Sequence, residues 1–574
     1  MKKLMVKICA LLMALLMVTS FVACEQFKDF LPAELLGGDF STLPEEESKE
    51  EQSSDENSSE TETYPNKPSE PNKPNDPNES ENSSEENNPK EEETNKPNES
   101  ENPSEDNNPE EEEEEEEIPD FGEDTTLLTN AGAGLPKGKN GVYEVDFTNA
   151  TYVKNVTEQG YYLDGCPTVS KNGKNPAVLV IPVEFSDVTA SRKGYTIDKI
   201  EKAWKGETGT TDYVSVKDYY YQSSYGKLEL DITVWSEWFR PKNRSTYYKN
   251  KTMNYYGQQI AIGDQMVIDE ALAYLAGKTD LSKFDSDGNG YIDAVAIVNT
   301  LTIGEDDFNW AYRYWNLYTN NKDELYEYDN VSMNDYLWAS YEFMHESYDN
   351  NGSVSYTNKN ALSTYTYIHE FGHILGSDDY YDYAGVSEPM GGCDVMDAMA
   401  GDHNPFTKFN YGWLTTSKLI VAETSVTLTL SSFTQTGETI IIANNWNKKL
   451  GAYQEYYIIA YYTGDGLNGG DYGYFSRDGV VVYHVNATLY KDVYEGEIYY
   501  DIYNSNTDES DPDGAGTKDN LIEYVKSSEG SYTYVVGDTI PATTKDDQGN
   551  KIAYTFEVIS LTADGATITF TKNG

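Results

Sequence analysis

The chain has 574 residues, more than a single hydrophobic core normally organises, so more than one folded unit is expected. Its formal net charge is −57, and residues 25–120 alone hold about 35 acidic and about six basic side chains. Nucleic-acid binding requires clusters of Lys and Arg, which the mature sequence lacks, so a nucleic-acid partner is not expected.

Residues 1–24 have the features of an export signal. Three lysines precede an apolar run at 8–23, which is shorter than the roughly 20 residues that a membrane span needs. The run ends in FVAC at 21–24, which resembles a bacterial lipoprotein signal, with Phe where Leu is usual. The resemblance implies a lipid on Cys24 and an extracellular protein anchored to the bacterial cell membrane. An ordinary secretory signal cleaved near Ala23 is the alternative.

Residues 25–120 form an acidic low-complexity linker. From residue 40 to about 118 the chain consists of Glu, Asn, Ser, Pro and Lys with almost no aliphatic side chains, so no core can form there. PNESENSSEENNPKEEE from Pro77 recurs as PNESENPSEDNNPEEEE from Pro97. Prolines and self-repelling carboxylates predict a disordered, extended stalk. A tail that binds cations or a cationic partner is the alternative.

The remaining sequence predicts an α+β fold in two parts, preceded by a lead-in or pro-segment at 121–175. In the first part, residues 176–415, strands are expected at 177–185 and 294–299 and helices at 198–204 and 258–276. The second part, residues 416–574, contains short alternating runs that predict an all-β sandwich. These runs are 426–430, 456–462, 479–485 and 566–571.

The chemistry concentrates in YIHEFGHILG at 367–376. Residues four apart lie on the same helix face, so His369 and His373 can reach one cation, with Glu370 beside them. Imidazole is a good zinc ligand, and a zinc site with one open position acidifies water for a neighbouring carboxylate to deprotonate. The spacing therefore predicts two zinc ligands and a general base.

A helix ending at Gly376 allows a sharp turn that brings acidic residues back toward the histidines. Asp379 is the expected third ligand, and Asp378 and Asp382 are its competitors. An amphipathic helix with two surface histidines would show the same five-residue pattern. The chain has only five histidines, however, so this spacing favours a metal site.

At this point the sequence resembles the immune inhibitor A-like (M6 family) metallopeptidases of the metzincin type. HEFGHILGSDD resembles their zinc signature and GCDVMDAMAGDHNP their methionine turn, which implies that Met396 lies beneath the metal. Four further segments carry the resemblance: AVLVIPVEFSD, DYYYQSSYGKLEL, KFDSDGNGYIDAVAIV and FNYGWL. It covers roughly residues 175–415 and implies a metzincin-like catalytic domain that cleaves polypeptides.

The chain departs from some metzincins after the methionine turn. They place a Tyr two residues after the methionine, where it can stabilise the oxyanion, but Ala398 stands here. His403 is a candidate oxyanion or substrate contact, and a turn histidine is the alternative. Met396 could equally serve as core packing, which is compatible with a floor beneath the metal.

A second metal site is expected in the aspartate-rich segment from residue 285. Asp285, Asp287, Asn289 and Asp293 place oxygen ligands at positions one, three, five and nine of a calcium loop, and Tyr291 lies at position seven. Hard oxygen donors fit calcium rather than zinc. Position twelve lacks the usual Glu, so no EF-hand is implied, and the calcium ion is expected to be structural.

Only two cysteines, Cys166 and Cys393, fall in sequence expected to fold. A four-thiolate zinc site is therefore excluded. A disulfide between them suits an exported protein. An unpaired thiol and a latent form with Cys166 on the zinc are the alternatives.

Together these features predict a zinc-dependent endopeptidase in which Glu370 takes a proton from water and passes it to the leaving amine. The alternatives are a zinc hydrolase of a non-peptide amide and a surface adhesin or binding lipoprotein with a structural metal. The sequence leaves the oligomeric state open.

Overall fold

The computed structural model describes residues 127–128, 134–149 and 175–574, and these belong to one compact unit. Short gaps interrupt the last range at 256–257, 305–306, 322–323, 349–353, 384–386, 399–400, 470–474, 476, 495–496 and 508–518. The predictions on the export signal, Cys24, the acidic linker and Cys166 lie outside the described residues. Within them, helices and strands are mixed, with more strand than helix.

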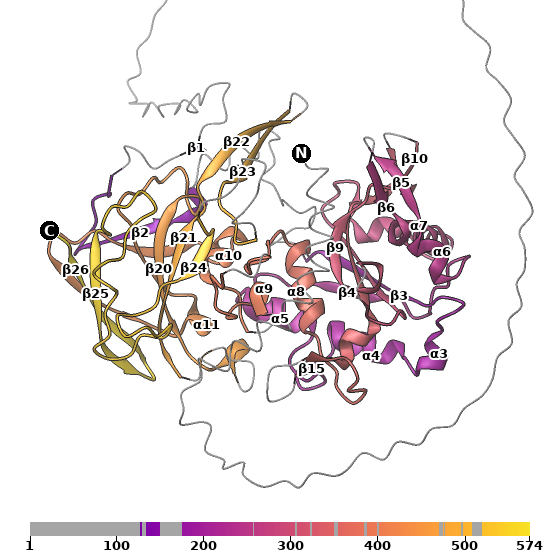
Figure 1. Cartoon of the computed structure of the whole chain (residues 1–574), viewed down its shortest axis with the longest axis horizontal. Coiled ribbons are helices and arrows are strands. Elements are labelled where there is room, and N and C mark those ends of the chain that lie inside the picture. Colours follow the sequence, from indigo (N-terminus) through magenta and orange to yellow (C-terminus); the bar gives the residue numbers. More distant parts are fainter. Residues whose placement is uncertain are drawn as a thin grey trace, which may run out of the picture. The chain divides into compact units, whose positions relative to one another are not determined.

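The first part is built on a five-stranded mixed sheet (Figure 1). Its order is β4 (Asp231–Val234), β3 (Ala177–Val183), β8 (Ala294–Asn299), β14 (Asp335–Ser340) and β9 (Tyr312–Trp315). The first four strands are parallel, whereas β9 pairs antiparallel with β14 and forms one edge. β3 and β8 are buried along their whole length, as central strands covered on both faces are. The strands expected at 177–185 and 294–299 are confirmed.

Helices cover both faces of this sheet. One face packs against α4 (Ile197–Lys205), α5 (Val216–Ser223) and α8 (Tyr365–Ile374), and the other against α7 (Gly263–Ala276). Figure 1 shows α6 (Ser245–Lys249) beside α7. No described helix is both long and apolar enough to cross a bilayer.

The helix expected at 258–276 starts later than predicted. Residues Gln258–Ala261 form strand β6, which pairs with β5 (Thr252–Tyr255), and α7 begins at Gly263. A side chain at Gly263 would collide with the backbone oxygen of Tyr248, at 2.0 Å from its Cβ, so the chain crosses closely here before the helix starts. The helix at 198–204 is confirmed as α4.

The second part is formed by two larger sheets. One has the order β2 (Val142–Asp146), β17 (Thr416–Ile420), β19 (Thr439–Ile442), β20 (Glu455–Tyr462), β21 (Gly479–Asn486) and β24 (Ile522–Tyr524). The other has the order β18 (Ser425–Leu430), β26 (Gly565–Lys572) and β25 (Tyr554–Thr562). Apolar side chains from both sheets form one hydrophobic cluster. All four predicted strands are present, within a residue or two of their expected ends.

The predicted lead-in contributes a strand to this part. β2 pairs antiparallel with β17 over five residues, and the Phe147 ring stacks on Phe409 at 4.2 Å. The backbone N–H of Trp446 also donates to the carbonyl oxygen of Gly134. Residues 134–149 therefore belong to the edge of the six-stranded sheet, and removal of a pro-segment that included them would expose β17.

Smaller elements connect these layers. The additional strands are β1 (Leu127–Leu128), β7 (Tyr291–Ile292), β10 (Thr319–Asn321), β11 (Glu324–Leu325), β12 (Glu327–Tyr328), β13 (Val331–Met333), β15 (Ser347–Tyr348), β16 (Val354–Ser355), β22 (Leu489–Tyr494) and β23 (Glu497–Ile502). The short helices are α3 (Ala190–Lys193), α9 (Val395–Ala398), α10 (Pro405–Asn410) and α11 (Phe433–Thr436).

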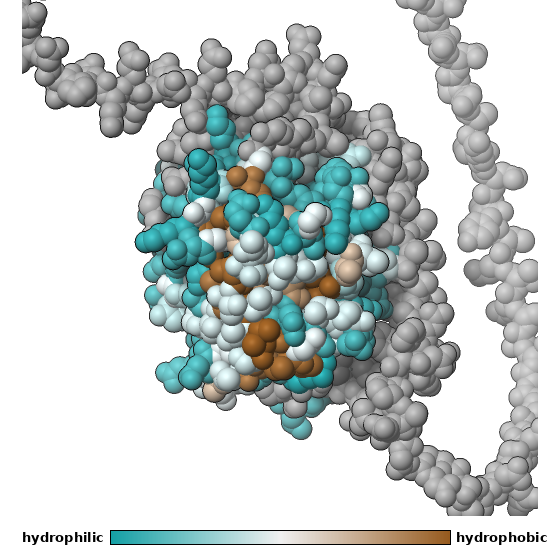
Figure 2. Space-filling model, turned by 90° about the vertical axis from the view of Figure 1, so that its left-hand side faces the viewer, coloured by the Kyte–Doolittle hydropathy of each residue, from teal (hydrophilic) through white to brown (hydrophobic). Residues whose placement is uncertain are grey.

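Figure 2 shows the face at the C-terminal end of the molecule, which is mainly hydrophilic or intermediate in hydropathy. Its hydrophobic side chains form small groups among polar ones. Threonine hydroxyls pair across β18 and β26, where Thr427 meets Thr569 and Thr429 meets Thr567. Alternate side chains of β26 are buried, as in an antiparallel sheet with one face in water.

Candidate metal centre

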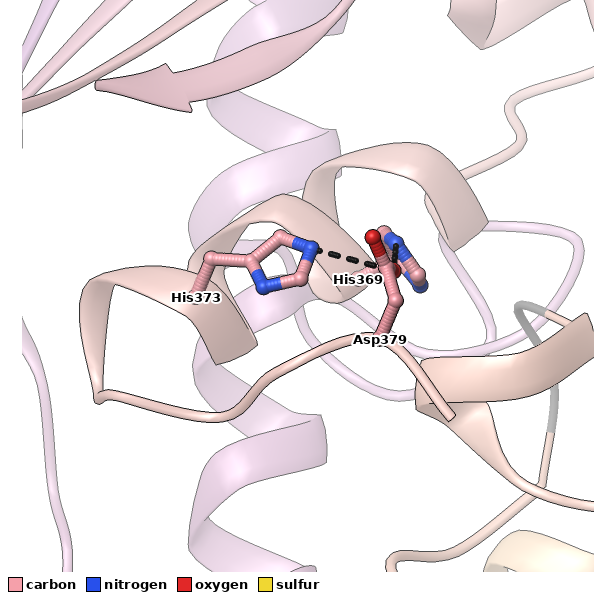
Figure 3. Close-up of side chains that lie close together, drawn as sticks. All are labelled: His369, His373 and Asp379. Atoms are coloured by element: carbon pink, nitrogen blue, oxygen red, sulfur yellow. Dashed lines mark ion pairs between the residues drawn. The ribbon is translucent and has the colours of Figure 1, made fainter. Parts of the chain in front are cut away.

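Helix α8 carries the two histidines on one face. His369 and His373 are one turn apart, and their ring centroids lie 4.9 Å from each other. The helix ends at Ile374, and Gly376 follows with φ of +93°, a conformation that side-chain-bearing residues rarely adopt. This turn reverses the chain, so Asp379 lies against the two rings (Figure 3).

The three side chains direct one donor atom each toward a common point. Oδ1 of Asp379 lies 3.0 Å from Nε2 of His369 and 3.3 Å from Nε2 of His373. A tetrahedral zinc ion with bonds of about 2.0–2.1 Å separates its donor atoms by roughly 3.3 Å. The observed separations therefore fit the edges of a zinc coordination shell.

The other ring nitrogens determine what the three atoms can bind. Nδ1 of His369 lies 2.8 Å from the carbonyl oxygen of Val395, and Nδ1 of His373 lies 2.7 Å from that of Ser377. A carbonyl oxygen only accepts, so each Nδ1 carries a proton and a neutral ring presents an Nε2 lone pair to Asp379. The buried Oδ1 of Asp379 has no hydrogen-bond donor. Two lone pairs and a carboxylate oxygen facing one another fit a cation.

Protonation of Nε2 on His369 and His373 is the alternative to a cation between these three donor atoms. Burial disfavours charged imidazoles, yet the Asp379 carboxylate raises the pKa of His373 to about 9. Burial likewise disfavours the Asp379 carboxylate, but the two imidazoles hold its pKa well below the usual range. The site thus strongly favours positive charge, which a divalent ion supplies between the same three atoms.

Glu370 is buried next to the two histidines. It lies in α8 between His369 and His373 along the chain, and only 7% of it is exposed. Burial raises the pKa of its carboxyl, whereas the imidazoles and the backbone N–H of Arg313 in β9 act in the opposite direction. A raised carboxyl pKa suits general base catalysis near neutral pH.

The two competing aspartates do not join this group. Asp378 is exposed, and Oδ2 of Asp382 accepts hydrogen bonds from the backbone and side chain of Ser387 at 2.8 and 3.3 Å. Among the described residues, the three donors that converge here are those of His369, His373 and Asp379.

Met396 lies directly beneath the helix. A Cβ added to Gly372 would lie 2.5 Å from the Met396 sulfur, so the two residues are in close contact. The residue before Met396 supplies the carbonyl oxygen that binds His369. The methionine segment therefore packs against α8 and orients His369. Ala398 is the last residue of the short helix α9 that contains Met396.

His403 is buried in the core. Only 1% of it is exposed, and the rings of Tyr219 and Trp413 each lie 5.7 Å from its ring. Neither ring nitrogen has a hydrogen-bond partner, and burial lowers its pKa well below the usual value. A substrate carbonyl cannot reach this position, so the arrangement favours the turn histidine over the oxyanion contact.

Tyrosines support the site in ways that the motif alone did not indicate. The Tyr383 hydroxyl donates to Oδ2 of Asp379 at 2.6 Å, which leaves Oδ1 facing the histidines. The hydroxyls of Tyr220 and Tyr411 donate to the carbonyl oxygens of Ile368 and Gly372 in α8, at 2.6 and 2.9 Å. In the sequence, only the tyrosines that surround Asp379 could have indicated its contact with Tyr383.

The aspartate-rich segment forms a tight loop. Asp285, Asp287 and Asp293 each bring a carboxylate oxygen within 4.8 Å of the others. Asp285 also accepts from the backbone N–H groups at positions 288, 289 and 290, and Gly288 and Gly290 have φ of +77° and +88°.

Position five and the strand that follows complete this loop. The Asn289 side chain accepts from the backbone N–H of Tyr291 at 2.8 Å. Asp293 accepts from the backbone N–H of Ala177 at 2.7 Å, which connects the loop to β3. Three of the residues predicted to hold calcium, the aspartates, thus converge beside the central sheet, whereas the Asn289 side chain contacts the loop's own backbone.

The thiol of Cys393 is buried near the methionine segment and is free among the described residues. Burial raises the pKa of this thiol. Its predicted partner Cys166 lies outside the described residues, so the disulfide stays a prediction.

No family model matches this chain, and no curated protein sequence matches it.

Proposed function

We propose that this protein is a zinc-dependent endopeptidase. The observation that carries the proposal is the convergence of two imidazole Nε2 lone pairs and Oδ1 of Asp379, with the buried Glu370 beside them. The resemblance of residues 175–415 to the immune inhibitor A-like metallopeptidases supports the same activity and a metzincin-like fold. The apolar cluster shared by the two C-terminal sheets supports the sandwich proposed for residues 416–574.

His369, His373 and Asp379 would hold the zinc, and Tyr383 and the backbone carbonyls of Val395 and Ser377 orient them. Zinc bound there supplies a Lewis acid that polarises the scissile carbonyl and acidifies water. Glu370 takes the proton of the attacking water and returns it to the leaving amine. Burial of Glu370 raises the pKa of its carboxyl, which makes both transfers accessible near neutral pH.

Strand β9 favours a peptide over another amide as substrate. It forms an edge of the five-stranded sheet, and no described strand pairs with its other side. An extended peptide can add to such an edge through main-chain hydrogen bonds. The backbone N–H of Arg313 in β9 acts on the Glu370 carboxylate, so this edge lies next to the base.

A structural metal site is the competing function. Structural zinc is normally closed by four protein ligands, whereas three converge among the described residues here. A buried carboxylate beside three ligands has a use in hydrolysis, where the fourth position takes water, and none in a site closed by four ligands. These features favour the enzyme over an adhesin or binding lipoprotein.

Two accessory features complete the proposal. The loop of Asp285, Asp287, Asn289, Tyr291 and Asp293 would hold a structural calcium ion. The convergence of the carboxylates of Asp285, Asp287 and Asp293 supports this, because calcium prefers oxygen ligands. The signal at residues 1–24 supports lipidation of Cys24 and attachment to the outer face of a bacterial membrane, with the acidic linker as a stalk.

The test compares three substitutions in the full chain. Glu370→Gln should abolish casein cleavage while zinc stays bound, because the ligands are intact and the base is lost. Asp379→Asn should weaken zinc binding and abolish cleavage, and the exposed neighbour variant Asp378→Asn should change neither. Full cleavage by Glu370→Gln, or activity that survives complete chelation of metal, would refute the proposal.

A further inference from the structure

A second group of histidine and carboxylate side chains lies in the C-terminal part, in the six-stranded sheet. We define the His484 cluster as Glu455, His484, Glu523 and Asp547. His484 in β21 lies between Tyr457 of β20 and Glu523 of β24 in the strand register, so these side chains share a face. Asp547 comes from the 541–551 segment.

The imidazole is held rigidly. Its ring stacks on Tyr457 at 4.5 Å with an interplanar angle of 14°, and 7% of the side chain is exposed. Nε2 lies 3.0 Å from Oε1 of Glu455 and 3.8 Å from Oδ1 of Asp547. One donor atom from each of these three residues lies within 4.8 Å of the others. The 3.8 Å separation is too long for a hydrogen bond and about 0.5 Å longer than the spacing of two ligands on a tetrahedral zinc ion, so a small movement of Asp547 would bring both atoms onto one ion.

Further contacts match those that orient metal ligands. Nδ1 of His484 lies 3.3 Å from Oε1 of Glu523, and ligand histidines commonly donate their second N–H to a carboxylate. Asn486 donates to Oδ2 of Asp547 at 2.6 Å, so Oδ1 faces the imidazole. Tyr383 holds Asp379 in the same way at the first centre.

The charges of the cluster are unbalanced without a cation. Three carboxylates surround one imidazole, so even a protonated ring leaves two negative charges in excess. Among the described residues, no Lys or Arg forms an ion pair with any of these carboxylates. A divalent ion removes this excess, and one imidazole nitrogen with carboxylate oxygens is a donor set that zinc and similar transition metals accept.

We propose that Glu455, His484 and Asp547 form a second divalent-metal site, of the zinc class, which fastens the 541–551 segment to the six-stranded sheet. This segment already contacts β20: Tyr457 donates to the carbonyl oxygen of Lys545 at 2.5 Å, and the backbone N–H of Asp547 donates to Oε1 of Glu455 at 2.7 Å. The ion adds a bond between the sheet and the segment. The site does not depend on the peptidase proposal.

The test counts zinc bound to the full chain after metal removal, dialysis against Zn²⁺ with excess Ca²⁺, and mass-spectrometric metal analysis. Wild type and the control Glu438→Gln should bind two equivalents; Glu438 directly precedes β19 and pairs with Lys418 of β17 in the same sheet. His484→Gln should bind one and keep the first centre, and His369→Gln should bind one and keep the second. Asp547→Asn should also bind one, which covers the case in which His484→Gln fails to fold.

An unchanged zinc count in Asp547→Asn and in folded His484→Gln would overturn the proposal and assign the cluster to an ion pair of protonated His484. The peptidase proposal fails separately, if Glu370→Gln retains cleavage. The two hypotheses are therefore distinguished by different variants and different readouts.

Discussion

The candidate metal centre on α8 and the His484 cluster differ in the number of carboxylates around the proposed metal position. On α8, two histidines donate Nδ1–H to neutral backbone carbonyls, and Asp379 is the only anionic ligand. In the His484 cluster, two carboxylates face Nε2 and a third faces Nδ1. A divalent ion bound by His369, His373 and Asp379 would keep a net positive charge, whereas the carboxylates of the His484 cluster would neutralise one bound there. The first therefore suits polarisation of a substrate, and the second suits a structural connection.

Substitution of a proposed zinc ligand on α8 should have the largest effect on activity. His373→Ala should reduce casein cleavage at least about 10³-fold, because the metal and its Lewis acidity are lost together. Bound zinc should fall by one equivalent and leave the His484 cluster filled. Glu438→Gln is the control and should cleave at the wild-type rate. Cleavage within tenfold of wild type in a zinc-depleted His373→Ala chain would contradict the assignment.

The contact that orients Asp379 should have the next largest effect. Tyr383→Phe removes the donor to Oδ2, and loss of such a partner commonly weakens metal binding about 10–100-fold. Competition with a chromophoric chelator measures this change. Tyr247→Phe, at an exposed tyrosine of α6, serves as the control and should bind zinc normally. Equal zinc affinity in both variants would show that Asp379 needs no orienting partner.

The contact beneath α8 should affect stability. Gly372→Ala forces a methyl group onto the Met396 sulfur, and such overpacking costs about 1–3 kcal/mol of unfolding free energy. Thermal unfolding measures this loss of stability. In a Met396→Ala background the sulfur is absent, so Gly372→Ala should cost less there than in the wild-type background. Gly277→Ala is the matched control, because the nearest atom to an added Cβ there, the carbonyl oxygen of Tyr274, lies 3.5 Å away, an ordinary van der Waals contact. Similar melting temperatures for the two alanine variants would contradict the close packing.

The smallest effect concerns pH in the metal-free chain. Burial disfavours a charged His484 ring, but Glu455 and Glu523 raise its pKa from 6.5 to about 10. The ion pair therefore stabilises the fold fully below about pH 6.5, and this contribution is lost as pH rises toward 10. Between pH 6.5 and 10 the melting temperature in chelator should fall further in wild type than in His484→Gln, by on the order of a few °C. Parallel curves would show that the ion pair contributes nothing.

The first cluster could be predicted from sequence because it is local. Two histidines four residues apart on one helix, followed by a glycine turn, place three side chains together without any knowledge of the fold. The His484 cluster combines strands and a segment separated by 29 residues and more. No periodicity connects such positions, so only the structure reveals them.

One sequence-based expectation failed, and one open question was answered, for a related reason. His403 follows Met396 closely, but spacing along the chain does not indicate whether its side chain is exposed or buried; it is buried, which favours the turn histidine. At 258–261 the apolar pattern was compatible with helix, whereas pairing with Thr252–Tyr255 favours a strand. In both cases tertiary contacts decided what the local pattern left open.

The most direct test of the central claim is X-ray absorption at the zinc edge of the His484→Gln chain loaded with one equivalent of zinc. We expect two imidazole nitrogens and one carboxylate oxygen at about 2.0–2.1 Å, with the remaining position filled by a solvent oxygen. A shell containing sulfur, a single imidazole, or a spectrum unchanged by Asp379→Asn would contradict the proposed coordination by His369, His373 and Asp379.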